Sequence, residues 1–128
     1  MRVLIVDDHE LIRKVTIRAL QARSDIACIE ARNRQEALDK ATHSQPDVIL
    51  LDINMGDEDG FSIGRDIKQH LPDIPILFFS LHDDARHREA AAAIGEGIVL
   101  KDQAGTMLVN ALEIVMQRKK FFPCDAGS

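Results

Sequence analysis

The sequence Asp-Val-Ile-Leu-Leu-Asp at positions 47–52 decides the fold that we predict. Its apolar part, residues 48–51, is unbroken, which is typical of a strand buried on both faces of a parallel sheet. The run ends at the carboxylate of Asp52, and a polar loop follows it up to Gly60. Because sites in open α/β sheets form beyond the carboxyl ends of strands, we predict that Asp52 is the reactive centre.

Apolar runs alternate with helical patterns along the rest of the chain. The runs that predict strands are residues 3–6, 26–31, 48–51, 74–79 and 98–100, and the stripes that predict helices lie within residues 11–20, 33–41, 61–71, 83–94 and 108–116. Strands that alternate with helices are typical of βαβ units. The sequence therefore predicts an α/β fold, in which helices cover both faces of a five-stranded parallel sheet.

Two local patterns refine the first two helices. One apolar stripe at helical spacing defines the first helix, and we expect it to face the core. Its residues are Leu11, Ile12, Val15, Ala19 and Leu20. The second helix begins with Asn33, followed three residues later by Glu36, and this spacing predicts a capping box.

The bulk properties indicate a single soluble domain. The chain has 128 residues, of which 45% are hydrophobic, and a net charge of -5, which argues against a general binder of nucleic-acid phosphates. A DNA-binding domain elsewhere on a longer chain stays open. Two cysteines form no disulfide framework, no apolar run is long enough to span a membrane, and acid follows the first strand too early for a signal peptide. We therefore expect a cytoplasmic protein with no membrane contact.

The last residues differ in composition from the rest. Residues 121–128 contain Pro, Gly and Ser, and we predict that they begin a linker or C-terminal tail after a domain formed by residues 1–120.

Functional groups follow four of the five predicted strands: Asp7 with Asp8, Asp52, Ser80 and Lys101. The strand that ends at residue 31 carries none of them, so we place it at an edge of the sheet. Each residue alone has an ordinary explanation as a helix cap, a turn residue or a solvated charge. Their joint occurrence at separate strand ends favours a functional site instead.

Three carboxylates in one crevice repel each other and raise each other's pKa, and a bound divalent cation removes that cost. Oxygen ligands with spare water positions suit Mg²⁺. A carboxylate such as Asp52 can attack a phosphoryl group and form an acyl phosphate. Lys101 would supply positive charge, and Ser80 could hydrogen-bond a phosphoryl oxygen. The five histidines have no metal-binding spacing, so we give none of them a role.

Over residues 1–120, the chain resembles the receiver domain of bacterial two-component response regulators. The resemblance rests on Asp7-Asp8 after the first strand, on Asp52 with Asp59-Gly60 behind it, and on Ser80 and Lys101. The Leu100-Lys101-Asp102 ending and the Lys119, Phe121, Phe122 and Pro123 pattern are similar to the NarL/FixJ subfamily. Members of that subfamily usually carry a C-terminal helix-turn-helix domain that binds DNA.

The resemblance implies the flavodoxin-like fold with strand order 2-1-3-4-5, which is the order of receiver domains among doubly wound sheets. It implies that Asp52 accepts phosphoryl from a histidine kinase or a small donor, without turnover of an external substrate. Asp8, Asp52 and the Asn54 backbone carbonyl would ligate Mg²⁺, and Asp7 would act through a metal-bound water. Lys101 would contact the phosphoryl group, and Ser80 would turn toward it. A homodimer through the last two helices and the strand between them is a further expectation.

Four positions depart from the receiver pattern. Ile98 replaces an aromatic residue that reports phosphorylation, Gly56 replaces a loop proline, Leu81 replaces a small residue, and Asp102 replaces a proline. The departures concern the readout more than the acceptor chemistry. They keep one alternative open, an atypical receiver that acts as a phosphorylation-independent interaction module.

Two other families share parts of the pattern. A haloacid-dehalogenase-type phosphatase also uses a strand-end aspartate with Mg²⁺, but it needs a second aspartate where this chain has Asn54. A flavodoxin-like cofactor carrier needs a phosphate-cradling loop after the first strand, where Asp7 and Asp8 would repel a phosphate. No phosphate-binding glycine motif is present either.

Overall fold

A computed structural model describes residues 1–81 and 84–122 of the chain. For residues 104 and 106 it describes the backbone only. The predicted helix start at residue 83 and residues 123–128 of the predicted tail, with Cys124, lie outside the described residues.

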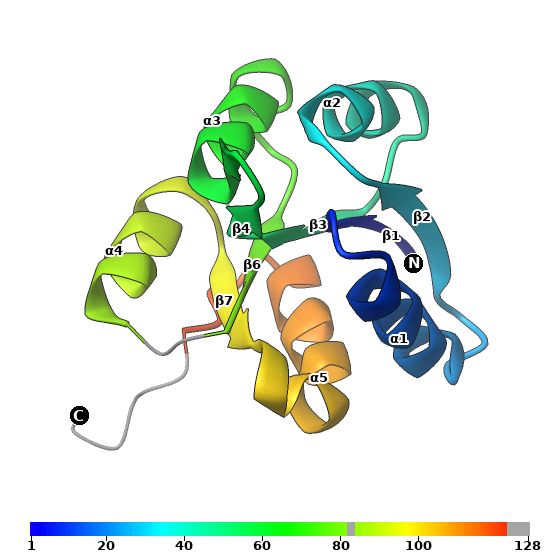
Figure 1. The fold of residues 1–128 in the computed structure, drawn as a ribbon. Helices are drawn as coiled ribbons and strands as arrows, with labels where there is room; N and C mark the ends of the chain where they lie inside the picture. The colour runs from blue at the N-terminus through cyan, green and yellow to red at the C-terminus, as the bar shows by residue number, and fades with distance from the viewer. Residues whose placement is uncertain (82–83, 123–128) are drawn as a thin grey trace.

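The fold is a parallel five-stranded sheet between two layers of helices (Figure 1). The strands of this sheet are β1 (Arg2–Val6), β2 (Ala27–Ala31), β3 (Val48–Asp52), β6 (Ile76–Ser80) and β7 (Gly97–Leu100). Their order is β2-β1-β3-β6-β7, which is the predicted 2-1-3-4-5 order of the flavodoxin-like fold. The strand without a functional group, β2, lies at an edge, as predicted.

Helices follow the strands as the sequence predicts. They are α1 (Glu10–Gln21), α2 (Arg34–His43), α3 (Gly60–His70), α4 (Ala85–Ile94) and α5 (Ala104–Met116), with a 3-10 turn, η1 (Lys101–Gln103), before the last. Figure 1 shows α2, α3 and α4 on one face of the sheet and α1 and α5 on the other. An antiparallel ribbon of two short strands, β4 (Asn54–Met55) and β5 (Glu58–Asp59), was not predicted.

The strands β3 and β6 form the centre of both hydrophobic cores. Every residue of β3 and of β6 is buried, which fits the unbroken apolar runs in their sequences. Side chains alternate between the two faces, so each strand supplies both cores. Leu51 and Phe78 pack with α2, α3 and α4, and Leu50 and Leu77 pack with α1 and α5.

The predicted core stripe of α1 is confirmed at Leu20 and is wrong at Leu11, Ile12, Val15 and Ala19. Leu11 and Val15 are 74% and 60% exposed, whereas Arg13, Thr16 and Leu20 are buried. Arg13 turns inward because its guanidinium group donates to the Asp7 backbone carbonyl at 2.8 Å and to the Glu30 carboxylate. These bonds satisfy the buried charge and let the long side chain cover the sheet. An exposed apolar surface remains on α1.

The predicted capping box of α2 is confirmed in a modified form. The Asn33 side chain accepts a hydrogen bond from the Glu36 backbone N–H at 2.9 Å. The returning bond goes from the Glu36 side chain to the backbone N–H of Arg32 rather than to that of Asn33.

The chain that follows α5 returns to the edge of the sheet. The Phe121 backbone N–H donates to the Glu96 carbonyl at 2.8 Å, and the Ile98 N–H donates to the Phe121 carbonyl at 2.9 Å. Phe121 is 9% exposed and packs with α5 and β7. The predicted domain boundary after residue 120 stays a prediction, but Phe121 belongs to the packed core.

Among the described residues, every helix is too short or too polar to cross a bilayer.

Candidate functional site

The carboxyl ends of the central strands carry an acidic cluster. Ligand atoms of Asp7, Asp8, His9 and Asp52 all lie within 4.8 Å of one another. Asp7 and Asp52 are buried, and Asp8 and His9 are exposed. The sequence therefore predicted the meeting of the three carboxylates correctly, because β1 and β3 are neighbours in a parallel sheet.

Asp52 is the most buried member of the cluster. Its Oδ2 atom lies 2.9 Å from the Lys101 ammonium, and its Oδ1 atom accepts the Asn54 backbone N–H at 3.0 Å. Burial raises the pKa of Asp52 to about 6, while the hydrogen bonds from Lys101 and Asn54 lower it and the charge of Asp7 raises it further. Burial of a carboxylate thus outweighs one ammonium partner.

The acidic cluster fits a hard divalent cation. Asp7 uses Oδ1 to accept the His9 backbone N–H at 2.8 Å, but its Oδ2 is buried and has no hydrogen-bond partner among the described residues. A buried carboxylate oxygen without a partner is costly, and a cation removes that cost. The cluster offers mostly oxygen donors, with one side open to water at Asp8, which is the donor set that Mg²⁺ prefers.

Two glycines shape the loop around Asp52. Gly56 has φ +66°, which glycine adopts easily and proline cannot, and a Cβ atom there would lie 3.0 Å from Asp8 Oδ2. This conformation explains why a proline is absent from this position. A Cβ atom at Gly60 would lie 2.2 Å from the Asp52 backbone carbonyl. The loop can therefore close over the end of β3 only with glycine at residue 60.

Ser80 and Lys101 follow the neighbouring strands. Asp52 pairs with Phe79 in the sheet register, so buried Ser80 lies one residue beyond it on β6, paired with Leu100 of β7. Lys101 directly follows β7, and its side chain is 9% exposed. Its ammonium lies 5.5 Å from the centre of the Phe79 ring, which adds a cation–π contact. The predicted residues thus share one edge of the sheet, where Lys101 and the Asn54 backbone N–H both bond to the Asp52 carboxylate.

Sequence analysis missed the position of His9. Its Nδ1 atom lies 3.1 Å from Asp8 Oδ1 and 3.6 Å from Asp7 Oδ1, although its side chain is 61% exposed. The spacing motifs of metal-binding histidines did not identify His9, because the other three members of the cluster are aspartates. The adjacency of His9 to Asp7 and Asp8 at a strand end was the available signal.

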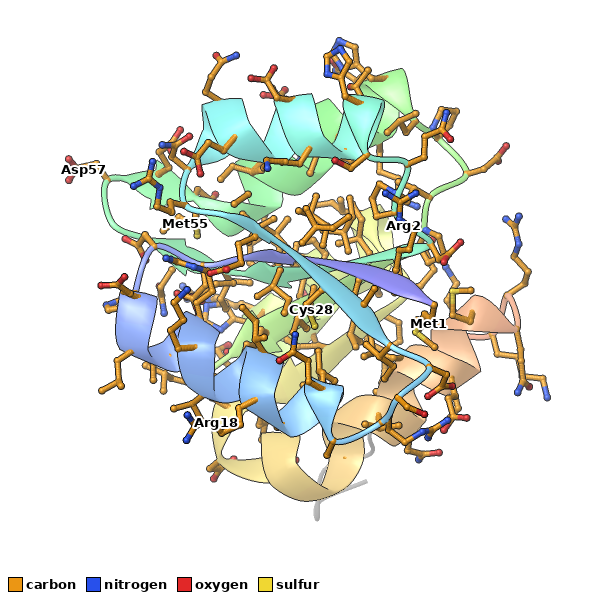
Figure 2. The ribbon with its side chains drawn as sticks, turned by 90° about the vertical axis from the view of Figure 1, so that its right-hand side faces the viewer. Met1, Arg2, Arg18, Cys28, Met55 and Asp57 are labelled. Atoms are coloured by element: carbon orange, nitrogen blue, oxygen red, sulfur yellow. The ribbon has the colours of Figure 1, made fainter. Side chains whose placement is uncertain are left out.

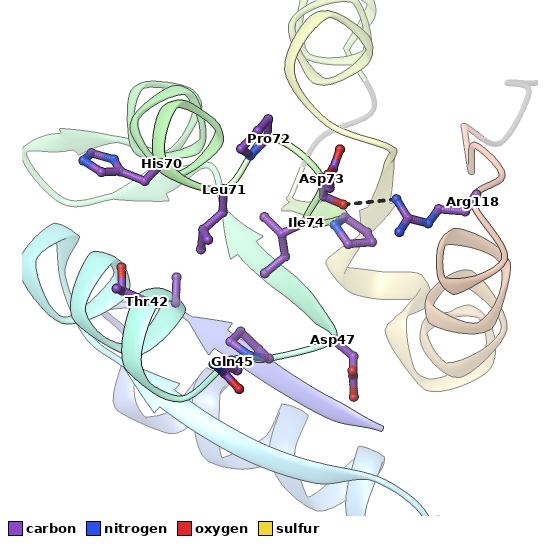
Figure 3. A pocket seen from close by; sticks show the side chains of 12 residues that line it. Thr42, Gln45, Asp47, His70, Leu71, Pro72, Asp73, Ile74 and Arg118 are labelled. Atoms are coloured by element: carbon purple, nitrogen blue, oxygen red, sulfur yellow. Dashed lines mark hydrogen bonds between the residues drawn. The ribbon is translucent and has the colours of Figure 1, made fainter.

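The end of the sheet opposite the acidic cluster has a hollow of its own. Figure 2 shows Met55 and Asp57 at the loop end and Met1 and Arg2 at the other. The second end has a hollow of about 460 Å³ between the loops before β3 and β6 (Figure 3). Leu71 and Ile74 lie at its wall, and Arg118 Nη1 donates to the Asp73 carbonyl at 3.4 Å. This hollow lies away from the acidic cluster.

The chain belongs to the family of response regulator receiver domains. The model of that family, the response regulator receiver domain, matches residues 3–113. Membership and the intact acidic cluster do not favour the alternative of a phosphorylation-independent interaction module.

Curated relatives of the chain are transcriptional regulators. It is 31% identical over 119 residues to the transcriptional regulatory protein DegU of Brevibacillus brevis, a match that covers 91% of this chain and 50% of that protein. It is 31% identical over 117 residues to the DNA-binding transcriptional activator DevR/DosR of Mycobacterium tuberculosis, with coverage of 90% and 54%. The chain thus spans about half the length of these relatives.

Solved receiver structures share the fold. The isolated receiver domain of RcsB from Salmonella enterica serovar Typhimurium, in the apo form, is 28% identical with a TM-score of 0.87, and the match covers 96% of this chain and 92% of that one. The NarL receiver domain from Mycobacterium tuberculosis is 30% identical with a TM-score of 0.82, with coverage of 91% and 95%.

Proposed function

We propose that the protein accepts a phosphoryl group on Asp52, from a sensor histidine kinase or from a small donor such as acetyl phosphate. The observation that supports this most directly is a buried carboxylate that lies 2.9 Å from an ammonium and within one cluster with two further aspartates. In the transfer, an Asp52 carboxylate oxygen forms a bond to phosphorus. The bond from phosphorus to the donor nitrogen or oxygen breaks, and the donor's imidazole or acetate leaves. The phosphoryl group stays on Asp52, so the protein is itself the acceptor and no external substrate is turned over.

The protonation state of Asp52 supports its role as nucleophile. With a pKa of about 6, the side chain is mostly ionised near neutral pH. It is also more basic than an ordinary aspartate, which favours attack on phosphorus. Burial therefore raises the reactivity of Asp52 without leaving it protonated at neutral pH.

We propose that Asp8, Asp52 and the Asn54 backbone carbonyl hold Mg²⁺, with Asp7 acting through a metal-bound water. Bound there, Mg²⁺ would neutralise the acids and the charge on the phosphoryl oxygens. The unsatisfied Asp7 Oδ2 supports this assignment. His9 would orient Asp8 through the 3.1 Å contact between Nδ1 and Oδ1.

Lys101 and Ser80 would stabilise the phosphorylated state. Lys101 already donates a hydrogen bond to Asp52. A small movement of its ammonium would redirect this hydrogen bond to a phosphoryl oxygen. Ser80, buried on the adjacent strand, would turn its hydroxyl toward the same group.

The test is phosphoryl uptake from acetyl phosphate, followed by intact mass. We expect wild-type protein to gain one phosphoryl group with Mg²⁺ and almost none in EDTA. Asp52→Asn should lose the gain entirely, and Lys101→Ala should still accept phosphoryl while its phosphorylated form signals less. Glu89→Gln, an exposed substitution on α4, serves as control. Uptake by Asp52→Asn would overturn the assignment of the acceptor.

We propose that the kinase docks on the exposed apolar surface of α1. Leu11 and Val15 are exposed there, and Ile12 and Val15 line a groove of about 190 Å³ that reaches Lys101. A partner that delivers a phosphoryl group to Asp52 must approach the edge of the sheet where this groove reaches Lys101. Leu11→Asp should slow transfer from a phosphorylated kinase by about tenfold, since one buried anchor is worth 1 kcal/mol or more. Uptake from acetyl phosphate should be unchanged, and equal loss with both donors would exclude the docking role.

The wider role follows from the relatives. The names of these relatives describe transcriptional regulators, and the relatives are about twice as long as this chain. We therefore propose that this receiver domain controls a DNA-binding output domain in the cytoplasm. Dimerisation through α4, β7 and α5 would couple phosphorylation of Asp52 to the output domain. Sedimentation with and without beryllofluoride tests this, and an unchanged monomer would contradict it.

A further inference from the structure

The β4–β5 ribbon holds one oxygen of the Asp52 carboxylate, and Lys101 holds the other. Asn54 of β4 donates its backbone N–H to Asp52 Oδ1 at 3.0 Å, and it pairs with Asp59 of β5. A ribbon of two-residue strands is at most marginally stable by itself. The orientation of the Asp52 carboxylate therefore depends on what fixes the ribbon to the rest of the protein.

The first residue of α2, Arg34, fixes the ribbon at β5. Its backbone N–H donates to Glu58 Oε1 at 3.2 Å, and its Nε donates to Glu58 Oε2 at 3.0 Å. The negative carboxylate thus lies at the start of a helix, where the helix dipole favours it. In the ribbon register Glu58 pairs with Met55, the 4% exposed neighbour of Asn54.

The other end of the Arg34 guanidinium is anchored in α3. Nη2 donates to Ser62 Oγ at 2.9 Å, and Nη1 pairs with the Asp66 carboxylate. The Arg34 side chain is only 30% exposed, and its planar fork is occupied on both sides. One side chain thus joins two helices to the ribbon, and it does so 24 to 32 residues away in sequence from its partners.

We propose that Arg34 is a positioning residue for the acceptor site: through Glu58 it holds the ribbon, and with it Asn54, against Asp52. The inference rests on the proposed function, because it concerns the Mg²⁺ ligand and the nucleophile assigned there. Without Arg34, the ribbon keeps buried Met55 and the Asp59 cap of α3, but Glu58 loses its hydrogen bonds to the first residue of α2. The Asn54 N–H then leaves Asp52 Oδ1 for part of the time, and its carbonyl no longer has a fixed position.

A matched control lies two residues away. Arg32 also pairs with a carboxylate at the start of α2, with Nη2 and Glu36 Oε2 2.8 Å apart, but its side chain is 67% exposed. The contacts of Arg32 among the described residues do not reach the ribbon. Arg32→Ala and Arg34→Ala therefore remove the same kind of side chain and charge, and only the second releases the ribbon.

The experiment compares the 128-residue chain with Arg34→Ala, Arg32→Ala and the milder Glu58→Gln. Mg²⁺ affinity is measured by NMR titration, and the Asn54 amide is followed first without metal. We expect Arg34→Ala to bind Mg²⁺ about tenfold more weakly, as outer-shell substitutions at metal sites do, and to shift the metal-free Asn54 amide. Glu58→Gln should shift the same amide in the same direction, and Arg32→Ala should leave both readouts unchanged. A purely structural role for Arg34 would lower stability without moving them.

Arg34→Ala combined with Glu58→Gln should weaken Mg²⁺ binding no more than the stronger single change, because both break the Arg34–Glu58 connection. An unshifted Asn54 amide in Arg34→Ala, or equal losses with Arg32→Ala, would overturn the positioning role. If wild-type protein binds no Mg²⁺ at these acids, the proposed function fails. The metal-free Asn54 amide then decides the role of Arg34 by itself.

Discussion

Asp52 and Glu96 are carboxylates at opposite ends of the same parallel sheet, and their surroundings differ in charge. Glu96 precedes β7, where its oxygens accept from the Lys68 ammonium at 2.9 and 3.0 Å and from the Ile76 N–H at 2.7 Å. The Lys120 ammonium lies 3.9 Å away. Asp52 has the Lys101 ammonium as a partner, and it lies in one cluster with two further carboxylates.

The difference separates an ion pair that stabilises the fold from the pair to which we assign the chemistry. Positive charge and a backbone donor compensate Glu96, so this carboxylate contributes to the packing of β6 and β7. The surplus of negative charge around Asp52 is costly in the protein alone and favours binding of a cation. A functional site can thus be recognised by charge that its own surroundings leave uncompensated.

The largest expected effect concerns stability against pH. The pKa of Asp52 is raised in the folded state from 3.8 to about 6, so the folded state holds this proton more tightly than the unfolded chain. The stabilisation is complete below about pH 3.8 and is lost as pH rises through about 6. We expect a loss of about 3 kcal/mol, because one pKa unit corresponds to about 1.4 kcal/mol.

Urea unfolding from pH 4 to pH 7 without metal would measure this loss. Asp52→Asn should lack it and should exceed the wild type in stability near neutral pH. Glu96→Gln should retain it. If the pH profiles of wild type and Asp52→Asn run parallel, the two carboxylates do not differ in the way we describe.

Glu96→Gln should lower the free energy of unfolding by about 2 kcal/mol, because it weakens charge-assisted hydrogen bonds to a partly buried ammonium. Phosphoryl uptake at Asp52 should stay at the wild-type level. Denaturant unfolding and the acetyl phosphate assay on one protein sample would check both parts. The matched control is Glu89→Gln, an exposed glutamate of α4, which should leave stability unchanged. Reduced uptake in Glu96→Gln would show that the two ends of the sheet are coupled.

Gly97→Ala should cost about 1 kcal/mol, the lower end of the range for overpacking, because the Phe121 segment can detach from the sheet edge. A Cβ atom at Gly97 would lie 2.4 Å from the Phe121 backbone carbonyl, whereas one at Gly105 meets nothing within 4 Å. Gly105→Ala, inside α5, should therefore stabilise the protein by about 0.5–1 kcal/mol. Thermal unfolding of the pair measures the contrast, and effects of equal sign would contradict the close approach of Phe121 to β7.

The fold was predictable because its central strands β3 and β6 are fully buried. An apolar run such as residues 48–51 has no polar face, so only a strand inside a covered sheet accounts for it. The acidic site followed from the same runs, since functional groups at the ends of parallel strands must meet at one edge. Asp7, Asp52 and Lys101 were therefore placed together without any knowledge of their contacts.

The buried face of α1 was not predictable in the same way. Leu11, Val15 and Ala19 form one stripe at helical spacing, and Arg13, Thr16 and Leu20 form another. Periodicity fixes that a helix forms, but it does not choose between stripes that lie side by side. The Asp7 carbonyl and Glu30 made the choice, because they give the Arg13 guanidinium buried partners.

By itself, the sequence determined the elements, their order and the residues at the strand ends, because apolar patterning and strand-end chemistry are properties of short segments. Only the tertiary structure decided the orientation of α1, the anchoring of the ribbon by Arg34 and the return of Phe121 to β7. Each of these depends on hydrogen bonds between residues far apart in the chain. Such bonds are chosen by which groups would otherwise be buried without a partner, and that is known only after the elements have packed.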